Sequence, residues 1–301
     1  MNDYLIQKAL DRAYKTAEEI NKLKPIAKPQ ALSDIKKKRL IERNYEALAP
    51  KTGYCDLDKL IKGFIPGHLY TLTGVENVGK TSIACNFAVR VAFQMKKVLY
   101  IALEPENTVI EYIASVYHDK RFDELTEDDL TLEGLPIEIL GKEDVATTEE
   151  LVNIIDSLDR YDLVVVDHVG YFTTSENNWL QQQSNTVKKM VAAAKKKQCA
   201  ILLIAHLRKR AKSEKKNYIP TSDDIAGSGA FKQDSTEVMI VTREPLTLDK
   251  DEVTYADMGK LYVTKTKTGP NGIIGLHFSE RKANIISDGE MIERQRYAIN
   301  S

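Results

Sequence analysis

Residues 74–81 constrain the fold of this chain more than any other part of its sequence. They read Gly-Val-Glu-Asn-Val-Gly-Lys-Thr, which matches the pattern G-x-x-x-x-G-K-[ST]. A β-rich apolar run precedes them and a helical pattern follows, so the match has the flanking strand and helix that the motif requires. A chance glycine-rich turn would seldom combine all of these features. We therefore predict a phosphate-binding loop between a strand and a helix.

The chemistry of this loop predicts a nucleoside triphosphate as its ligand. Glycines let the backbone amides curl around phosphates, and the positive end of the following helix attracts the same charge. The lysine of such a loop reaches the β- and γ-phosphates, and the hydroxyl after it binds magnesium. ATP and Mg²⁺ are thus the predicted cofactors. The predicted nucleotide-binding residues are Gly74, Val75, Glu76, Asn77, Val78, Gly79, Lys80, Thr81 and Ser82.

An acidic residue completes the expected magnesium site. Residues 161–167 form an apolar strand closed by Asp167, and ligands gather at the carboxyl ends of strands in open parallel sheets. An aspartate after a strand more often caps a turn or a helix. Downstream of a phosphate-binding loop, however, the metal role is favoured. We predict that Thr81 and Asp167 hold Mg²⁺.

Glu104 is the predicted general base for the attacking water. It directly follows the apolar run at 98–103, so it should project from the same sheet edge as the phosphate-binding loop. Glu106 is close enough to compete for this role. Glu104 could instead cap the next helix. We favour Glu104 because it stands at the strand end itself.

Alternating short apolar runs and helical patterns predict an α/β fold with a mainly parallel sheet flanked by helices. One helix is expected from 81 to 94, another from the capping box Thr147-Thr148-Glu149-Glu150, and a third with Val187, Met190, Val191 and Ala194 on one face. Strands are expected at 69–73, 98–103, 137–140, 163–167, 200–205, 238–242, 261–265 and 273–278.

Residues 1–50 are interpreted as an N-terminal helical arm and residues 51–301 as the main domain. An apolar seam of residues 6, 10, 13, 17 and 20 follows one side of the first helix, before Pro25 and Pro29 end it. Such a seam needs a partner surface. That surface could belong to a neighbouring subunit or to the helix's own domain, and the sequence supports the two interpretations about equally.

Composition sets further limits on the function. The chain has 301 residues, 43% of them hydrophobic, and a formal charge of -1, so any attraction for nucleic acid must come from local basic clusters. The three cysteines lie far apart, which favours free, buried thiols over a zinc site or disulfides. Neither a membrane-length apolar stretch nor a signal peptide is evident, so we expect a cytoplasmic protein without membrane contact.

With these parts in place, residues 50–285 resemble the ATPase domain of DnaB-type ring helicases. The resemblance implies a RecA-like P-loop core. The segment 52–67 is similar to an entry region that this family shares with its RadA- and KaiC-like relatives. The other matching segments are 102–104 around the catalytic glutamate, 204–207 at a strand end, 224–234 at the DNA loop, and 265–272 at a hairpin that reaches a neighbour's nucleotide.

The resemblance implies roles that the residues alone do not. His206 would sense the γ-phosphate, although an isolated histidine there would more often be structural. Lys265 and Lys267 would act across a subunit interface, as an arginine finger does. Lys267 stands where the family carries an arginine and lacks its bidentate fork, so Arg243 or Arg208 could be the finger instead. An exposed, solvated lysine is the plainer alternative.

The same resemblance implies contact with single-stranded DNA. Ala226 and Gly227 replace an arginine and an acid that are frequent in the family, so phosphate contacts must come from elsewhere. The run at 208–216 is strongly basic, and a basic run is usually just a solvated loop. Its place beside the DNA-loop match favours binding. The predicted DNA-binding residues are Arg208, Lys209, Arg210, Lys212, Gly229 and Lys232.

The leading hypothesis is therefore an ATP-driven, DnaB-like helicase or translocase that forms a homo-oligomeric ring, expected to be hexameric, in DNA replication. Its N-terminal seam resembles the linker helix that docks on the adjacent subunit, and a primase or helicase loader is an expected partner. A RadA- or KaiC-like recombination or regulatory ATPase without unwinding is the alternative. A small-molecule kinase is disfavoured because the sequence offers no lid or acceptor pocket.

Overall fold

The computed structural model describes residues 46–103, 105–157, 160–168, 179–207, 221, 225, 228–246, 254–279 and 281–300. These residues belong to one compact unit, Tyr45–Ser301. The apolar seam of the predicted arm lies outside the described residues. Ala49 is buried, and the Pro50 carbonyl accepts a hydrogen bond from the Phe64 amide, so the end of the predicted arm packs with the main domain.

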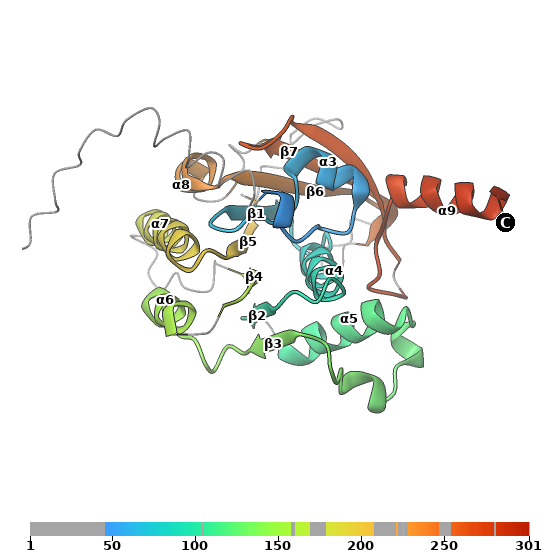
Figure 1. The fold of residues 1–301 in the computed structure, drawn as a ribbon, viewed down its shortest axis with the longest axis horizontal. Coiled ribbons are helices and arrows are strands. Elements are labelled where there is room, and N and C mark those ends of the chain that lie inside the picture. The colour runs from blue at the N-terminus through green and yellow to red at the C-terminus, as the bar shows by residue number, and fades with distance from the viewer. Residues whose placement is uncertain are drawn as a thin grey trace, which may run out of the picture. The chain divides into compact units, whose positions relative to one another are not determined.

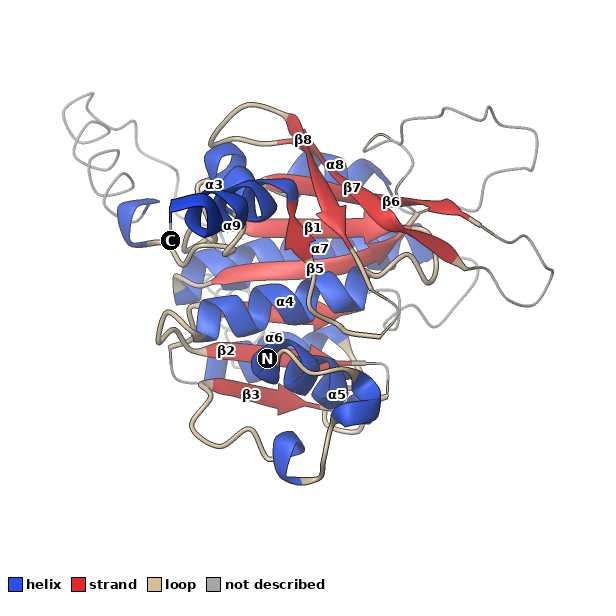
Figure 2. Cartoon of the chain, turned by 90° about the vertical axis from the view of Figure 1, so that its right-hand side faces the viewer, coloured by secondary structure: helices blue, strands red, loops and turns tan. Residues whose placement is uncertain are grey.

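A nine-stranded mixed sheet forms the centre of the unit (Figure 2). Its order is β3-β2-β4-β5-β1-β6-β7-β8-β9. The strands from β3 to β6 pair in parallel, and those from β6 to β9 pair antiparallel. The strands are β1 (Leu69–Gly74), β2 (Val98–Ala102), β3 (Ile137–Leu140), β4 (Leu163–Asp167), β5 (Ala200–His206), β6 (Glu237–Pro245), β7 (Tyr255–Lys265), β8 (Gly272–His277) and β9 (Ile286–Ser287).

Helices cover both faces of the parallel part of the sheet (Figure 1). The helices α3 (Cys55–Ile61), α4 (Lys80–Ala92) and α5 (Glu106–His118) share one apolar core with one face of the strands. Helices α6 (Thr148–Ser157), α7 (Trp179–Lys197) and α8 (Ser228–Asp234) flank the other face. Two short 3₁₀ turns, Phe122–Glu124 and Asp128–Leu130, follow α5, and α9 (Asp288–Asn300) follows β9. Because β2, β4 and most of β5 are buried on both faces, they need nearly continuous apolar runs. Strand β1 is also buried, but it includes the buried Thr71 and Thr73.

The predicted α/β fold is confirmed, and most strand bounds agree within one residue. The capping box at the start of α6 is also present. The Glu150 amide donates to the Thr147 hydroxyl at 3.1 Å, and the Thr147 amide donates to Glu150 Oε2 at 3.1 Å. Strands β6 and β7 extend beyond the prediction because their outer halves are polar and partly exposed, so an apolar run does not mark them.

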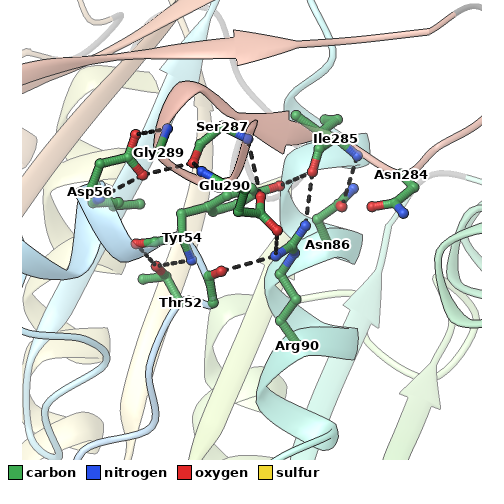
Figure 3. Close-up of polar contacts among 12 residues, drawn as sticks. Thr52, Tyr54, Asp56, Asn86, Arg90, Asn284, Ile285, Ser287, Gly289 and Glu290 are labelled. Atoms are coloured by element: carbon green, nitrogen blue, oxygen red, sulfur yellow. Dashed lines mark hydrogen bonds and ion pairs between the residues drawn. The ribbon is translucent and has the colours of Figure 1, made fainter. Parts of the chain in front are cut away.

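A polar network joins α4 to two distant segments (Figure 3). The Arg90 guanidinium donates to the carbonyls of Gly53 and Ile285, both at 2.9 Å, and forms a 2.8 Å ion pair with Glu290. It also lies 4.2 Å from the centroid of the Tyr54 ring. Helix α4 is thereby fixed to the segment before α3 and to the start of α9. This matters for the site because α4 begins with Lys80.

Two expectations from composition can be compared with the described residues. Their helices include none that is both long and apolar enough to span a bilayer. All three cysteines are free thiols; Cys85 and Cys199 are buried, whereas Cys55 is partly exposed. Burial raises the pKa of the Cys199 thiol to about 11.

Candidate nucleotide-binding site

The predicted phosphate-binding loop connects β1 to α4. Gly79 adopts φ +100° and Asn77 adopts φ +58°, which curls the backbone between the two elements. A Cβ at Gly79 would lie 2.8 Å from the Phe278 ring, so this position combines a left-handed backbone with a close neighbour. Val78 is buried, while Val75, Glu76 and Asn77 are exposed. The loop is therefore held at one side and open at the other.

Two features make this loop suitable for an anion. Helix α4 has no acidic residue in its first turn, so the positive end of its dipole is not compensated there. The Lys80 ammonium folds back over the loop and donates to the Val75 carbonyl at 2.8 Å. Its side chain is 7% exposed, so the charge lies inside the curl of the backbone. Thr81 follows it in the first turn of α4.

Asp167 ends β4 as a buried carboxylate, only 2% exposed. The Tyr100 hydroxyl of the neighbouring strand β2 donates to its Oδ2 at 2.8 Å. Burial and the Asp167 charge raise the pKa of Tyr100 well above its usual value, so this hydroxyl remains a donor. Sequence reasoning missed Tyr100, although a tyrosine within an otherwise aliphatic strand was a usable signal.

Strand register brings the predicted residues to one edge of the sheet. Gly74 pairs with His206, Ala102 pairs with Asp167, and the Leu103 amide donates to the Asp167 carbonyl at 2.7 Å. The ring of His206 lies edge-on to that of His168, with centroids 4.4 Å apart. The carboxyl ends of β1, β2, β4 and β5 therefore meet at the loop, as expected for an open parallel sheet.

Glu104 lies outside the described residues, but its competitor Glu106 does not. Glu106 begins α5, and its Oε1 occupies the space where a Cβ at Gly141 would stand. Gly141 follows β3, and strands β2, β4 and β5 separate β3 from β1. The Glu106 carboxylate is thus directed toward β3, away from the phosphate-binding loop. This geometry favours Glu104 over Glu106.

The donor set at this edge fits magnesium held together with a triphosphate. One hydroxyl and one carboxylate supply hard oxygen ligands, and Mg²⁺ typically takes its other ligands from water and phosphate oxygens. Within the described ranges, no group of three or more histidine, cysteine, aspartate or glutamate side chains is placed to hold a metal by itself. A site of this kind depends on the bound phosphates.

Known proteins with similar sequences belong to a family of ATPases, which agrees with a nucleotide-binding site at this position. The family model described as "DnaB-like helicase C terminal domain" matches residues 50–286. The chain belongs to the DnaB-like helicase C-terminal domain family. The replicative DNA helicase DnaB of Mycoplasma genitalium is 27% identical over 263 residues, which cover 78% of this chain and 56% of that protein. Its counterpart in Mycoplasma pneumoniae is 26% identical, with 76% and 54% covered.

Solved structures share the fold. One is described as a DnaB-like replicative helicase and its interactions with primase; it superposes with a TM-score of 0.70 at 15% identity, covering 93% of this chain and 76% of that one. A second solved structure, described as an ATPase domain, gives a TM-score of 0.69 at 15% identity, covering 85% of this chain and 99% of that one. The chain spans about half the length of the curated relatives it matches.

The DnaB-like hairpin predicted at 265–272 is present as the connection between β7 and β8. It lies at the opposite end of the strands from the loop. The end of β7 pairs with the start of β6, and the start of β6 pairs with Tyr70 near the start of β1, whereas the loop follows the end of β1. The Lys265 ammonium donates to the carbonyls of Gln233 and Ser235 at 3.1 and 2.6 Å. Lys267 is exposed, and no hydrogen bond or ion pair holds its ammonium within the described part of the chain.

The two alternative finger residues differ in position. Arg243 lies near the chain's own loop: its guanidinium carbon is 4.4 Å from the centroid of the Phe278 ring, which abuts Gly79. Its Nε donates to the Ala256 carbonyl at 2.7 Å. Arg243 thus has backbone and aromatic partners close to the phosphate-binding loop of its own chain. Arg208 lies outside the described residues.

The predicted DNA-binding residues are only partly described. Gly229 and Lys232 lie on α8 and are exposed, and the Lys265 ammonium contacts the carbonyl of Lys232. Arg208, Lys209, Arg210 and Lys212 lie outside the described residues. Ile225, within the predicted DNA-loop segment, is buried and pairs with Leu207 in an isolated β-bridge just after β5. The segment's start is therefore joined to the same sheet edge as His206.

Proposed function

We propose that this chain is the ATP-hydrolysing motor of a replicative DNA helicase that works as a ring of identical subunits. The observation that carries the proposal is the separation of two charged features in a DnaB-like domain. A phosphate-binding loop opens at one edge of the sheet, and Lys267 is exposed on a hairpin at the other edge. Head-to-tail association would bring the hairpin of one subunit to the loop of the next.

The described residues support the proposed phosphate binding. The backbone amides of the loop and the first turn of α4 bind the phosphates, and Lys80 exchanges its contact with the Val75 carbonyl for phosphate oxygens. Thr81 and Asp167 would hold Mg²⁺, which would supply positive charge to offset the β- and γ-phosphates. Tyr100 keeps the Asp167 carboxylate oriented. Glu104 accepts a proton from the attacking water, and His206 contacts the γ-phosphate.

Lys267 is proposed as the trans-acting finger. Its exposed ammonium would stabilise charge on the neighbour's transferring phosphate, in the way an arginine finger does. The Lys265 ammonium already contacts backbone carbonyls at the end of α8, and Arg243 lies beside its own loop. Lys267 is therefore the best placed of the three described candidates for the trans-acting finger.

Single-stranded DNA is the proposed track. Arg208, Lys209, Arg210, Lys212 and Lys232 would neutralise phosphates, and the Gly229 amide would donate to one. One related structure is described with primase, and we propose a primase or a loader as a partner here too. A hexamer is the ring size that the DnaB resemblance favours.

Strand displacement on forked DNA tests the proposed function directly. We expect the wild-type protein to separate the strands with ATP and Mg²⁺, and single-stranded DNA to stimulate its ATP hydrolysis. Lys80→Ala should abolish both activities with the fold intact, because it removes the charge that offsets the β- and γ-phosphates. ATP hydrolysis that no DNA stimulates, with no displacement on any fork, would point instead to a RadA- or KaiC-like ATPase.

Mixed rings test whether Lys267 acts in trans. Lys267→Ala alone should suppress turnover in the assembled protein while ATP binding persists. Lys80→Ala subunits are inactive but carry an intact finger. Mixing the two variants should therefore restore measurable hydrolysis at interfaces that pair an intact loop with an intact finger. No activity at any mixing ratio, or normal turnover by Lys267→Ala alone, would place the finger elsewhere.

A further inference from the structure

Glu237 is a buried acid at the first position of β6. It is fully buried, and its Oε2 has no hydrogen-bond partner among the described residues. Burial raises the pKa of its carboxyl to about 7, although the hydroxyls of Thr266 and Thr268, the Lys267 amide and the Lys265 charge all favour the ionised form. Burying a carboxyl group in such a place lowers the stability of the folded protein. The contacts that Glu237 makes therefore need a functional explanation.

Those contacts reach the turn that carries Lys267. The Thr268 hydroxyl lies 2.9 Å from Glu237 Oε1 and 3.1 Å from the Ile61 carbonyl. The Thr266 hydroxyl accepts the amides of Thr268 and Gly269 at 3.1 and 3.2 Å. The two residues that flank Lys267 therefore form a compact turn, and that turn rests on Glu237 and on the end of α3.

The next residue of the hairpin is equally confined. A Cβ at Gly269 would lie 2.0 Å from the Leu60 carbonyl, so the backbone packs directly on the end of α3. On the other side of the turn, the Lys265 ammonium contacts the carbonyls of Gln233, in the last turn of α8, and Ser235, just after it. The backbone around Lys267 is thus held from both sides while its side chain stays exposed.

We infer that Glu237 is a positioning residue that holds the turn 266–268 against the start of β6 and so directs Lys267 toward the triphosphate of a second copy of this chain. This inference rests on the proposed trans action of Lys267. A lysine offers a single point charge without the fork of arginine, so its reach and direction depend on its backbone. Displacing a charge by about 1 Å is enough to lose much of its effect on a transition state.

Three substitutions test the inference. Thr268→Val removes the hydroxyl and preserves the side-chain shape, Glu237→Leu removes the acceptor, and Glu237→Gln retains an acceptor at Oε1. Thr264→Val is the matched control, because its hydroxyl lies on β7 just before the turn, bonds the Val238 carbonyl of β6 and is not among the contacts of Glu237. Two quantities are measured: kcat for ATP in the assembled protein, and hydrogen exchange of the amides at 266–269.

We expect Thr268→Val and Glu237→Leu to lower kcat and to speed amide exchange in the turn by about tenfold, the effect of losing a hydrogen bond to a charged or buried group. ATP affinity should stay unchanged, since the loop lies at the other edge of the sheet. Glu237→Gln and the Thr264→Val control should remain within about twofold of wild type. If Glu237→Leu fails to fold, Thr268→Val decides by itself, because Thr268 is only half-buried.

Parallel assays of Lys267→Ala separate this inference from the proposed function. If Lys267→Ala hydrolyses ATP normally, the proposed finger fails whatever the exchange data show. If Lys267→Ala is inactive while Thr268→Val and Glu237→Leu keep wild-type kcat, Glu237 does not position Lys267 and the inference is overturned. Loss of kcat in these two variants together with faster exchange of the turn supports it.

Discussion

Arg90→Met should destabilise the domain far more than Arg121→Ala, which removes an exposed arginine. Methionine keeps much of the length and the aliphatic contact with Gly53 but removes the charge and every donor. The carbonyls of Gly53 and Ile285 lose a donor, and Glu290 loses its ion-pair partner. These three contacts connect α4 with segments far away in the sequence (Figure 3).

The expected loss follows from burial. The side chains of Arg90 and Glu290 are 14% and 17% exposed, so their pair is largely desolvated. Removing one partner of a buried ion pair costs about 3–5 kcal/mol, and the cation–π contact with Tyr54 adds about 1 kcal/mol. Because these contributions overlap and some solvent reaches the pair, we expect a loss of about 3 kcal/mol in the free energy of unfolding.

Urea unfolding followed by circular dichroism measures this loss, with Arg121→Ala as the control. Arg121 pairs with Asp123 through side chains that are 35% and 63% exposed, and such a surface pair contributes about 0–1 kcal/mol. The midpoint should fall clearly for Arg90→Met and hardly for Arg121→Ala, with similar m-values. A loss below about 1 kcal/mol in Arg90→Met would refute the reasoning that this network fixes α4.

Other variants test individual groups. Glu237→Gln should be more stable than wild type by an amount that grows from pH 5 to pH 8, up to about 3 kcal/mol. The reason is that the native carboxyl keeps its proton up to about pH 7, whereas the carboxyl of the unfolded chain loses it near pH 4.5. Equal urea midpoints of the two proteins at pH 8 would contradict this. Tyr100→Phe should raise the Mg²⁺ concentration for half-maximal hydrolysis roughly tenfold, since Asp167 loses a donor, and an unchanged magnesium titration would remove Tyr100 from the site. Glu104→Gln should bind ATP yet hydrolyse it about 10²–10⁴-fold more slowly, and an equal loss from Glu106→Gln alone would transfer the role.

The sequence by itself determined the features that depend on neighbours along the chain. The phosphate-binding loop, the buried strands and the α6 capping box all arise from residues within one short window, so their patterns are legible without coordinates. The position of Asp167 beside the loop was also predictable, because a parallel sheet places the carboxyl ends of its strands together. His206 was indicated only by the resemblance to DnaB-type helicases. Strands β6 and β7 were predicted too short because their outer halves lack an apolar run.

Only the tertiary structure decided which partners these residues meet. Tyr100 and Asp167 are 67 positions apart, and Glu237 meets Thr268 across 31 positions; no local pattern links either pair. Arg90 and Glu290 are separated by 200 positions. The structure likewise distinguishes Lys265, which contacts carbonyls at the end of α8, from the exposed Lys267, although both belong to one short motif. The physical reason is that long-range contacts depend on strand order and register, which bring together side chains that the sequence keeps apart.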